Sequence, residues 1–217
     1  GGISNRISVN IKWVDSETVT EETAPEIFKD ADGILVPGGF GPRGIDGKIS
    51  AISYARTRQI PFLGICLGMQ LSIVEFARSE AGLKDAHSIE LDPSTPHPVI
   101  ALLPGQSGGD NIGGTLRLGS YPCVLDESSK AFELYGEKII YERHRHRYEV
   151  NNDFRTILTE QGMKLSGLSP DGRIVEMCEL PEHPFFIATQ GHPELKSRPN
   201  RPHPLFKGFI RAASKAR

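Results

Sequence analysis

Hydrophobic and polar residues are arranged along the chain in short blocks that predict strands. Ile7, Val9, Ile11 and Trp13 alternate with polar residues, which predicts a strand over 7–13. Continuous apolar blocks at other places predict buried strands. Shorter strand-like segments follow further along the chain. Together, these predicted strands lie at 33–36, 61–65, 99–103, 115–118, 165–168, 174–177 and 185–189.

Helical spacing of apolar residues lies between several of these blocks. It predicts helices at 23–29, with Pro25 near the start, around 49–55, at 67–78 and at 205–210. Strands and helices in alternation are typical of an α/β fold with a mostly parallel central sheet and helices on both faces. The segment 104–114 is rich in glycine and predicts a mobile loop.

Composition narrows the class of protein. The chain has 217 residues, which fits one domain over 1–217, and 38% of them are hydrophobic. A net charge of −2 gives no general case for a nucleic-acid partner or an anionic membrane. No apolar run approaches the roughly 18 residues of a spanning helix. Three widely spaced cysteines suit neither a disulfide framework nor a metal site, so a reducing, cytoplasmic setting is expected. The abrupt start at Gly1 suggests a piece of a longer chain.

Candidate chemistry begins at Gly64-Ile65-Cys66-Leu67-Gly68, between a predicted strand and a predicted helix. Gly-x-Cys-x-Gly in this context is a nucleophile elbow with cysteine as the nucleophile. The helix N-terminus favours a thiolate, and the Leu67 N–H points to where an oxyanion forms. A buried structural cysteine is the plainer reading, but the flanking glycines favour the nucleophile. Cys123 and Cys178 lack this context and are interpreted as packing residues.

A cysteine nucleophile needs a base, and His192 is the best candidate. It follows the apolar strand 185–189, so it lies beyond a strand end, where α/β sheets gather their active sites. Glu194, two residues later, can fix the imidazole tautomer. His144 and His146 are the second choice, because the arginines around them do not orient a histidine as a carboxylate does.

These motifs carry a resemblance. Gly-Ile-Cys-Leu-Gly-Met-Gln at 64–70, with His-Pro-Glu at 192–194, resembles the class I, triad-type glutamine amidotransferases. Within that family, three further stretches resemble the CTP synthase branch, namely 113–119, 142–151 and 204–209. The resemblance spans the chain from Ile7 to about Ser214 and implies the flavodoxin-like α/β fold of the family.

The resemblance also implies roles for individual residues. Cys66, His192 and Glu194 would form the catalytic triad, and the N–H groups of Gly39 and Leu67 the oxyanion hole. Glutamine would be bound by a set that the family places at Gly39, Leu67, Gly68, Met69, Gln70, Glu90 and Arg147. Without the resemblance, these would be an ordinary turn, a helix-surface glutamine, a loop glutamate and one member of a solvated basic run. No metal site is implied.

The same resemblance implies a second domain that is not in this chain. A synthetase domain of the same polypeptide would use ATP and Mg to activate UTP, GTP would activate glutamine hydrolysis, and the full enzyme would be a homotetramer. The domain here would need no cofactor. The family usually has aromatic residues where this chain has Gly191 and Leu195, and their loss is expected to loosen the packing around His192.

Two other functions stay open at this point. The chain could serve another synthetase, such as GMP synthase, although the stretch 142–151 argues against that. It could also be a non-catalytic relative that only binds a partner, although the intact Cys66, His192 and Glu194 argue against that. The basic run 143–147 taken alone would also fit a phosphate or nucleic-acid patch, which the short run and the net negative charge disfavour.

Overall fold

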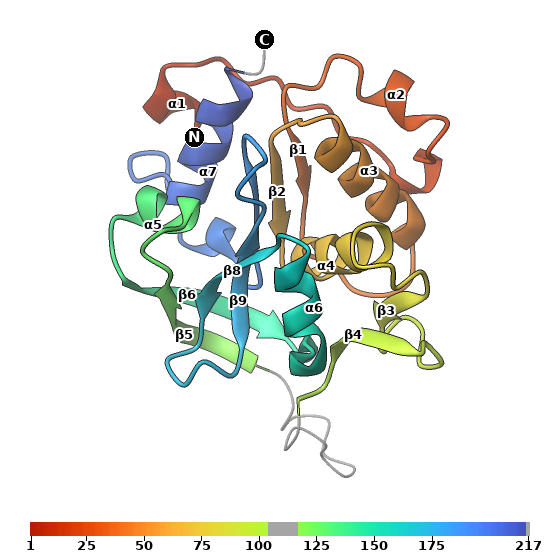
Figure 1. Ribbon diagram of the computed structural model, residues 1–217. Coiled ribbons are helices and arrows are strands. Elements are labelled where there is room, and N and C mark those ends of the chain that lie inside the picture. Colours follow the sequence, from red (N-terminus) through yellow and green to blue (C-terminus); the bar gives the residue numbers. More distant parts are fainter. Residues whose placement is uncertain (104–116, 216–217) are drawn as a thin grey trace.

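The computed structural model describes residues 1–103 and 117–215, and within them a central seven-stranded sheet lies between two layers of helices (Figure 1). The strand order is β1-β2-β10-β9-β8-β5-β6. These strands are β1 Ile34–Val36, β2 Phe62–Ile65, β5 Arg117–Leu125, β6 Ile139–His146, β8 Lys164–Leu168, β9 Val175–Glu179 and β10 Phe186–Thr189. A small second sheet joins β3 Ala86–Ser88, β4 His97–Ala101 and β7 Glu149–Val150.

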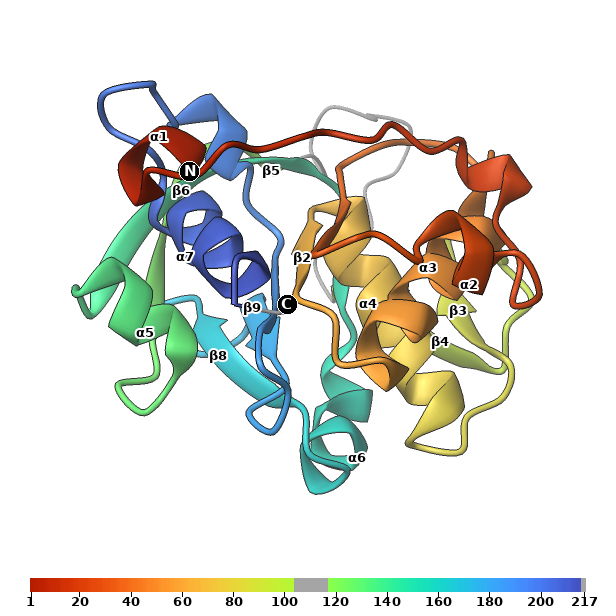
Figure 2. The ribbon, with the colours of Figure 1, turned by 90° about the horizontal axis from the view of Figure 1, so that it is seen from above.

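The helices cover both faces of the central sheet. Viewed from above, α3 and α4 lie on one side and α5 and α7 on the other (Figure 2). Each side has its own buried cluster, with Ile52 and Leu71 on the first side and Leu205 and Phe209 on the second. The helices are α1 Gly2–Asn5, α2 Ala24–Ile27, α3 Ile45–Thr57, α4 Leu67–Ser79, α5 Lys130–Tyr135, α6 Arg155–Glu160 and α7 Pro204–Ala213, with single 3₁₀ turns at Ser16–Thr18, Asn152–Phe154 and Pro193–Leu195.

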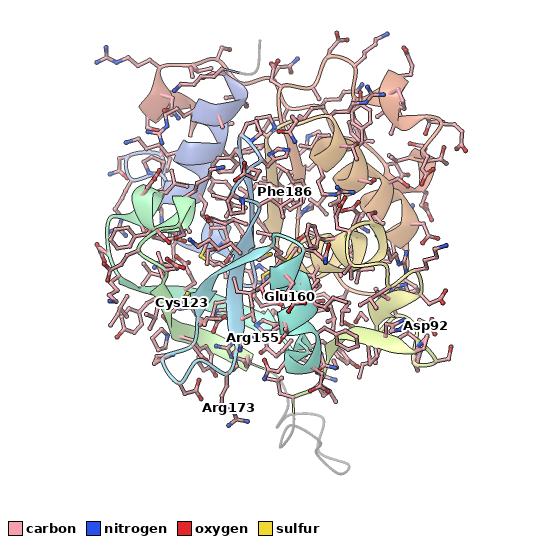
Figure 3. The ribbon with its side chains drawn as sticks, in the orientation of Figure 1. Asp92, Cys123, Arg155, Glu160, Arg173 and Phe186 are labelled. Atoms are coloured by element: carbon pink, nitrogen blue, oxygen red, sulfur yellow. The ribbon has the colours of Figure 1, made fainter. Side chains whose placement is uncertain are left out.

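Side chains of the central strands alternate between the two clusters, as period-two geometry requires. In β10, Phe186 belongs to the α4 side and Ile187 to the α7 side. Phe186 lies near the middle of the molecule (Figure 3) and stacks on Phe62 of β2 with ring centroids 4.4 Å apart. Apolar residues on both faces explain why the sequence blocks 61–65 and 185–189 are continuously hydrophobic.

The prediction of a mostly parallel sheet is wrong, although the α/β class with helices on both faces is confirmed. Among the described strands of the central sheet, only β1–β2 and β2–β10 are parallel pairs. The pairs β10–β9, β9–β8, β8–β5 and β5–β6 are all antiparallel. The links after β8 and β9 hold no helix and are too short for a crossover, so those strands return antiparallel; the link after β5 holds the short helix α5, but β6 still pairs antiparallel with β5 itself.

The predicted strand over 7–13 is also wrong. These residues form no strand, and the side chains of Ile11 and Trp13 are 66% and 88% exposed. Alternation alone does not make a strand, because a strand needs a neighbour to accept its backbone hydrogen bonds. No described strand lies beside this segment, whose Lys12 ammonium instead bonds the Ile27 carbonyl at 2.7 Å. The predicted loop over 104–114 lies outside the described residues.

Candidate active site

Cys66 occupies the turn between β2 and the first residue of α4. Its backbone has φ 52° and ψ −103°, a conformation that residues with a side chain rarely adopt. The turn is held on both sides: Cys66 N–H donates to the Thr189 carbonyl at 2.7 Å, and the Cys66 carbonyl accepts from Met69 N at 3.0 Å. Such strain in a well-anchored turn is typical of a functional position. The backbone at Cys66 therefore has the sharp strand-to-helix turn that was predicted from the sequence.

Close contacts explain the glycines around Cys66. A Cβ on Gly68 would lie 2.1 Å from the Val36 carbonyl oxygen, so helix α4 can approach β1 only with glycine there. A Cβ on Gly38 would lie 3.1 Å from His192 Cε1 and 3.4 Å from Cys66 Cβ. The turn after β1 thus lies against both predicted catalytic side chains.

His192 follows β10 directly and is held by its backbone and its side chain. Its N–H donates to the Arg143 carbonyl of β6 at 2.8 Å, and its Nδ1 donates to Glu194 Oε1 at 2.6 Å. The other ring nitrogen, Nε2, is buried and has no hydrogen-bond partner among the described residues. Nε2 is thus the nitrogen left to exchange a proton with Cys66 and a substrate.

The electrostatics favour a charged imidazole. Interaction with the Cys66 thiol, together with the Glu194 carboxylate, raises the pKa of His192 to about 10. Partial burial acts to raise the pKa of Glu194, but its hydrogen bond with His192 lowers it on balance. A cationic imidazole beside a thiol is the arrangement that activates cysteine nucleophiles.

The two N–H groups predicted to form the oxyanion hole are unused donors. Neither the Gly39 N–H nor the Leu67 N–H donates to any other group in the described part of the chain. A Cβ on Gly39 would touch Leu67 Cδ2 at 3.4 Å, so the two residues are neighbours. Leu67 N–H also lies at the N-terminus of α4, where the helix dipole favours negative charge.

Among the predicted glutamine-binding residues, Gln70 lies in a different environment from Glu90 and Arg147. Gln70 is buried, and its Nε2 donates to the Tyr148 carbonyl and to Gln190 Oε1, both at 3.1 Å. Burial raises the pKa of the Glu90 carboxyl, and the charge of the nearby Arg147 guanidinium partly opposes this increase. The Glu90 carboxyl and the Arg147 guanidinium are thus within electrostatic range of each other, and their part in binding glutamine stays a prediction.

Gly68 and Met69 pack within the Cys66 turn and do not form part of an exposed surface. Met69 is fully buried in the core, its N–H bonds the Cys66 carbonyl, and its own carbonyl accepts from Ser72 Oγ at 2.7 Å. Their part in binding glutamine stays a prediction that these contacts do not favour.

Strand β6 was not predicted from the sequence. Residues 139–146 alternate exposed and buried side chains, with Glu142, His144 and His146 pointing inward and Arg143 and Arg145 outward. The charged residues hid this period-two signal. His144 and His146 are therefore buried structural histidines beside the site, and burial lowers their pKa values to about 2 and about 3. Within the basic run 143–147, Arg143 and Arg145 are exposed and Arg147 is half-buried.

Cys123 and Cys178 are buried, as predicted. Burial raises the pKa of the Cys178 thiol to about 12 and also raises the pKa of the Cys123 thiol. All three cysteines are free, although Cys66 is itself only 3% exposed. The residues at 191 and 195 differ in environment. A Cβ on Gly191 would lie 2.8 Å from Glu142 Cβ, so the Glu142 side chain of β6 packs closely against this position, whereas Leu195 is exposed. The looser packing expected around His192 stays a prediction.

Within residues 1–103 and 117–215, no group of three or more His, Cys, Asp or Glu side chains is arranged to hold a metal ion. No helix in the same residues is long and apolar enough to cross a membrane.

Comparison with known proteins gives consistent matches. The family described as glutamine amidotransferase class I matches residues 2–212. A CTP synthase from Caldanaerobacter subterraneus is 59% identical over 211 residues, which cover 97% of this chain and 39% of that protein. A CTP synthase from Bacillus subtilis is 60% identical over 208 residues, again 39% of that protein. The chain thus spans about two fifths of the length of these relatives.

Solved structures agree with the sequence matches. The glutaminase domain of Trypanosoma brucei CTPS, with bound acivicin, superimposes with a TM-score of 0.93 at 36% identity, and the match covers 99% of this chain and 84% of that one. A putative GMP synthase subunit from Thermoplasma acidophilum has a TM-score of 0.63 at 18% identity, which shows a shared fold.

Proposed function

The chain belongs to the class I glutamine amidotransferases, and from this premise we propose that it hydrolyses L-glutamine to glutamate and ammonia, with Cys66, His192 and Glu194 as the triad. The observation that carries the proposal is the strained Cys66 turn beside a histidine whose Nδ1 is bound to a carboxylate. That combination provides a nucleophile, a proton carrier and the group that orients it.

The reaction follows from this geometry. The Cys66 thiolate attacks the side-chain amide carbon of glutamine, and the resulting oxyanion binds the N–H groups of Gly39 and Leu67. His192 Nε2–H gives its proton to the departing nitrogen, which leaves as ammonia, and a thioester remains. The now neutral His192 takes a proton from water, the hydroxide attacks the thioester, and glutamate leaves as the Cys66 thiolate is restored.

We further propose that the ammonia serves the amination of UTP to CTP. Support comes from the CTP synthases that match this chain at 59–60% identity and from their greater length, which leaves room for a synthetase domain. In such a full enzyme we expect ATP, Mg and activating GTP to act with that domain, a homotetramer as the assembly, and the cytoplasm as the setting. The domain proposed here, 1–217, would itself hold no cofactor.

The test separates glutamine hydrolysis from the synthetase reaction. In the longer polypeptide, Cys66→Ala is expected to abolish CTP formation from glutamine and to preserve CTP formation from free ammonia, because only the nucleophile is lost. The Cys123→Ala variant is the control and is expected to keep both. Glutamine-dependent CTP formation by Cys66→Ala would rule out the triad, and no CTP from ammonia in the parent protein would rule out the pathway. If the chain is a glutaminase that serves a different synthetase, the parent protein would form no CTP from ammonia, and Cys66→Ala would still show no glutamine-dependent CTP formation.

A further inference from the structure

A buried ionic cluster lies next to the site and takes no part in the chemistry above. The Arg117 guanidinium of β5 donates to Glu149 Oε1 at 3.3 Å and to Glu176 Oε1 at 2.8 Å. His144 Nδ1 and His146 Nε2 lie 2.9 Å apart. All five side chains are at most 10% exposed. Buried charges are expensive unless fully paired, so such a cluster calls for an explanation.

Hydrogen-bond chemistry fixes the position of each proton on the two histidines. His146 Nδ1 lies 3.2 Å from the Tyr148 carbonyl, which can only accept, so this nitrogen carries the hydrogen. His146 Nε2 is then bare and accepts from His144 Nδ1–H. His144 Nε2 is bare in turn, provided that both rings are neutral. Burial lowers both pKa values far below neutrality, which meets that condition.

The chain of hydrogen bonds ends at two acceptors that face each other. Bare His144 Nε2 lies 3.5 Å from Glu176 Oε2, and each has no hydrogen-bond partner among the described residues. Two buried lone pairs at that separation repel each other, whereas a proton between them satisfies both. A protonated Glu176 supplies that proton.

Charge balance requires the same proton. Two carboxyls face one guanidinium, so a neutral cluster holds one extra proton. Burial raises the pKa of Glu149 to about 8 and also raises the pKa of Glu176, although Arg117 opposes both shifts. The two carboxyls are coupled, and the retained proton belongs to the pair. The groups that face it are Arg117 and Tyr121 from β5, His144 and His146 from β6, Glu149 from β7 and, at longer range, His192.

The cluster is connected to the glutamine-binding residues on two sides. The Tyr148 carbonyl, which anchors His146, also accepts from Gln70 Nε2 at 3.1 Å. Arg147 lies between His146 and Tyr148 in the same turn. On the other side, the Glu176 carbonyl holds Gln190 N at 2.8 Å, two residues before His192.

We propose that Glu176 donates a retained proton to His144 Nε2, and that this chain of hydrogen bonds through His146 to Tyr148 positions Arg147 for binding the polar head of glutamine. Glu176, His144 and Arg117 are thus positioning residues. The proposal rests on the proposed glutaminase function, because it assigns a role to Arg147 in that reaction.

The first test is spectroscopic and needs no activity. In protein with ¹⁵N-labelled histidine, both His144 and His146 are expected as neutral Nδ1–H tautomers at pH 7, with assignments from His144→Gln and His146→Gln. Free imidazole prefers the other tautomer, so a merely packed pair would not give this signature. An Nε2–H tautomer at His144 would overturn the proposal.

The second test compares two isosteric substitutions. In Glu176→Gln, the amide oxygen accepts from Arg117 and the amide N–H donates to His144 Nε2, so the chain stays intact. In Glu149→Gln, the single remaining carboxylate pairs with Arg117 and ionises, so the donation to His144 is lost. The measurement is alkylation of Cys66 by the chloroketone analogue of glutamine, resolved into the half-saturating concentration and the maximal rate. We expect Glu149→Gln and Arg117→Lys to raise the half-saturating concentration about tenfold, the effect of roughly one charge-assisted hydrogen bond. We expect Glu176→Gln to keep the parent value and all three variants to keep the maximal rate.

Glu179→Gln is the matched control for removal of a buried carboxylate from β9. Glu179 accepts from Lys130 N and Ala131 N of α5, away from the cluster. This variant is expected to lose stability and to keep its half-saturating concentration. Equal effects of Glu176→Gln and Glu149→Gln would overturn the proposal, as would no effect of Arg117→Lys. Absence of Cys66 alkylation in the parent protein would instead count against the proposed function, and the tautomer measurement would still decide the hydrogen-bond chain.

Discussion

His192 Nδ1 and Glu194 Oε1 lie 2.6 Å apart, although only Pro193 separates the two residues along the chain. The 3₁₀ turn Pro193–Leu195, which starts right after His192, bends the backbone back and makes this contact possible. The contact fixes the hydrogen on Nδ1 and leaves Nε2 to the reaction.

Glu194→Gln is expected to lower kcat for glutamine hydrolysis on the order of 100-fold or more, because an amide at this position no longer stabilises the imidazolium. KM should change little, since Glu194 bonds His192 and is not among the residues proposed to bind glutamine. Steady-state kinetics check this, with Glu160→Gln on the exposed face of α6 as the control. A decrease in kcat of less than about threefold would contradict the assignment of Glu194 to the triad.

Cys66→Ala is expected to lower the pKa of His192 from about 10 towards its ordinary value, because the thiol is the largest cause of the increase. A residual increase should persist, since Glu194 stays in place. An NMR titration of His192 measures the shift, and Cys123→Ala should leave it unchanged. An unchanged His192 pKa in Cys66→Ala would mean that the thiol and the imidazole do not interact.

Gly191→Phe, which restores the aromatic residue usual in the family, is expected to impair the enzyme. Even a Cβ at 191 would lie 2.8 Å from Glu142 Cβ, so β6 or the His192 backbone has to move. Overpacking of this kind typically costs about 1–3 kcal/mol. Leu195→Phe is the matched control, because Leu195 is 49% exposed and has room for a larger ring. Thermal unfolding and kcat are the measurements, and equal tolerance of both substitutions would contradict the structure.

The buried Glu149–Glu176 pair predicts that stability falls as the pH rises. A carboxyl whose folded pKa is raised contributes stability that is complete below its unfolded pKa of 4.5 and is lost as the pH passes through the folded value of about 8. His192, with its raised pKa, contributes a loss of the same sign at higher pH. In Glu176→Gln, the amide replaces the protonated carboxyl, so the pair no longer contributes.

Urea unfolding at pH 5 and pH 8.5 tests this difference. The stability of Glu176→Gln relative to the parent protein is expected to increase by more than about 1 kcal/mol between the two pH values. Parallel stability curves for the two proteins would show that the folded pair holds no extra proton.

The sequence by itself determined the elements whose signals are local. The apolar block 61–65, the glycines around Cys66 and the helical spacing after it specify strand, turn and helix without help from distant residues. The same holds for β10 and His192, and for α7, which begins at Pro204. A nucleophile elbow and a His-x-Glu turn can therefore be recognised from the sequence alone, because each depends on residues within a few positions of one another.

Only the tertiary structure decided the features that depend on a neighbour far along the chain. No described strand lies beside the alternating residues 7–13, so they form no strand, whereas the charged segment 139–146 becomes a strand because β5 pairs with it. Arg117, Glu149 and Glu176 come from three different strands, and their charges become costly only where folding removes the water around all three. Burial and strand pairing are properties of the assembled sheet, so no local pattern could have indicated this cluster.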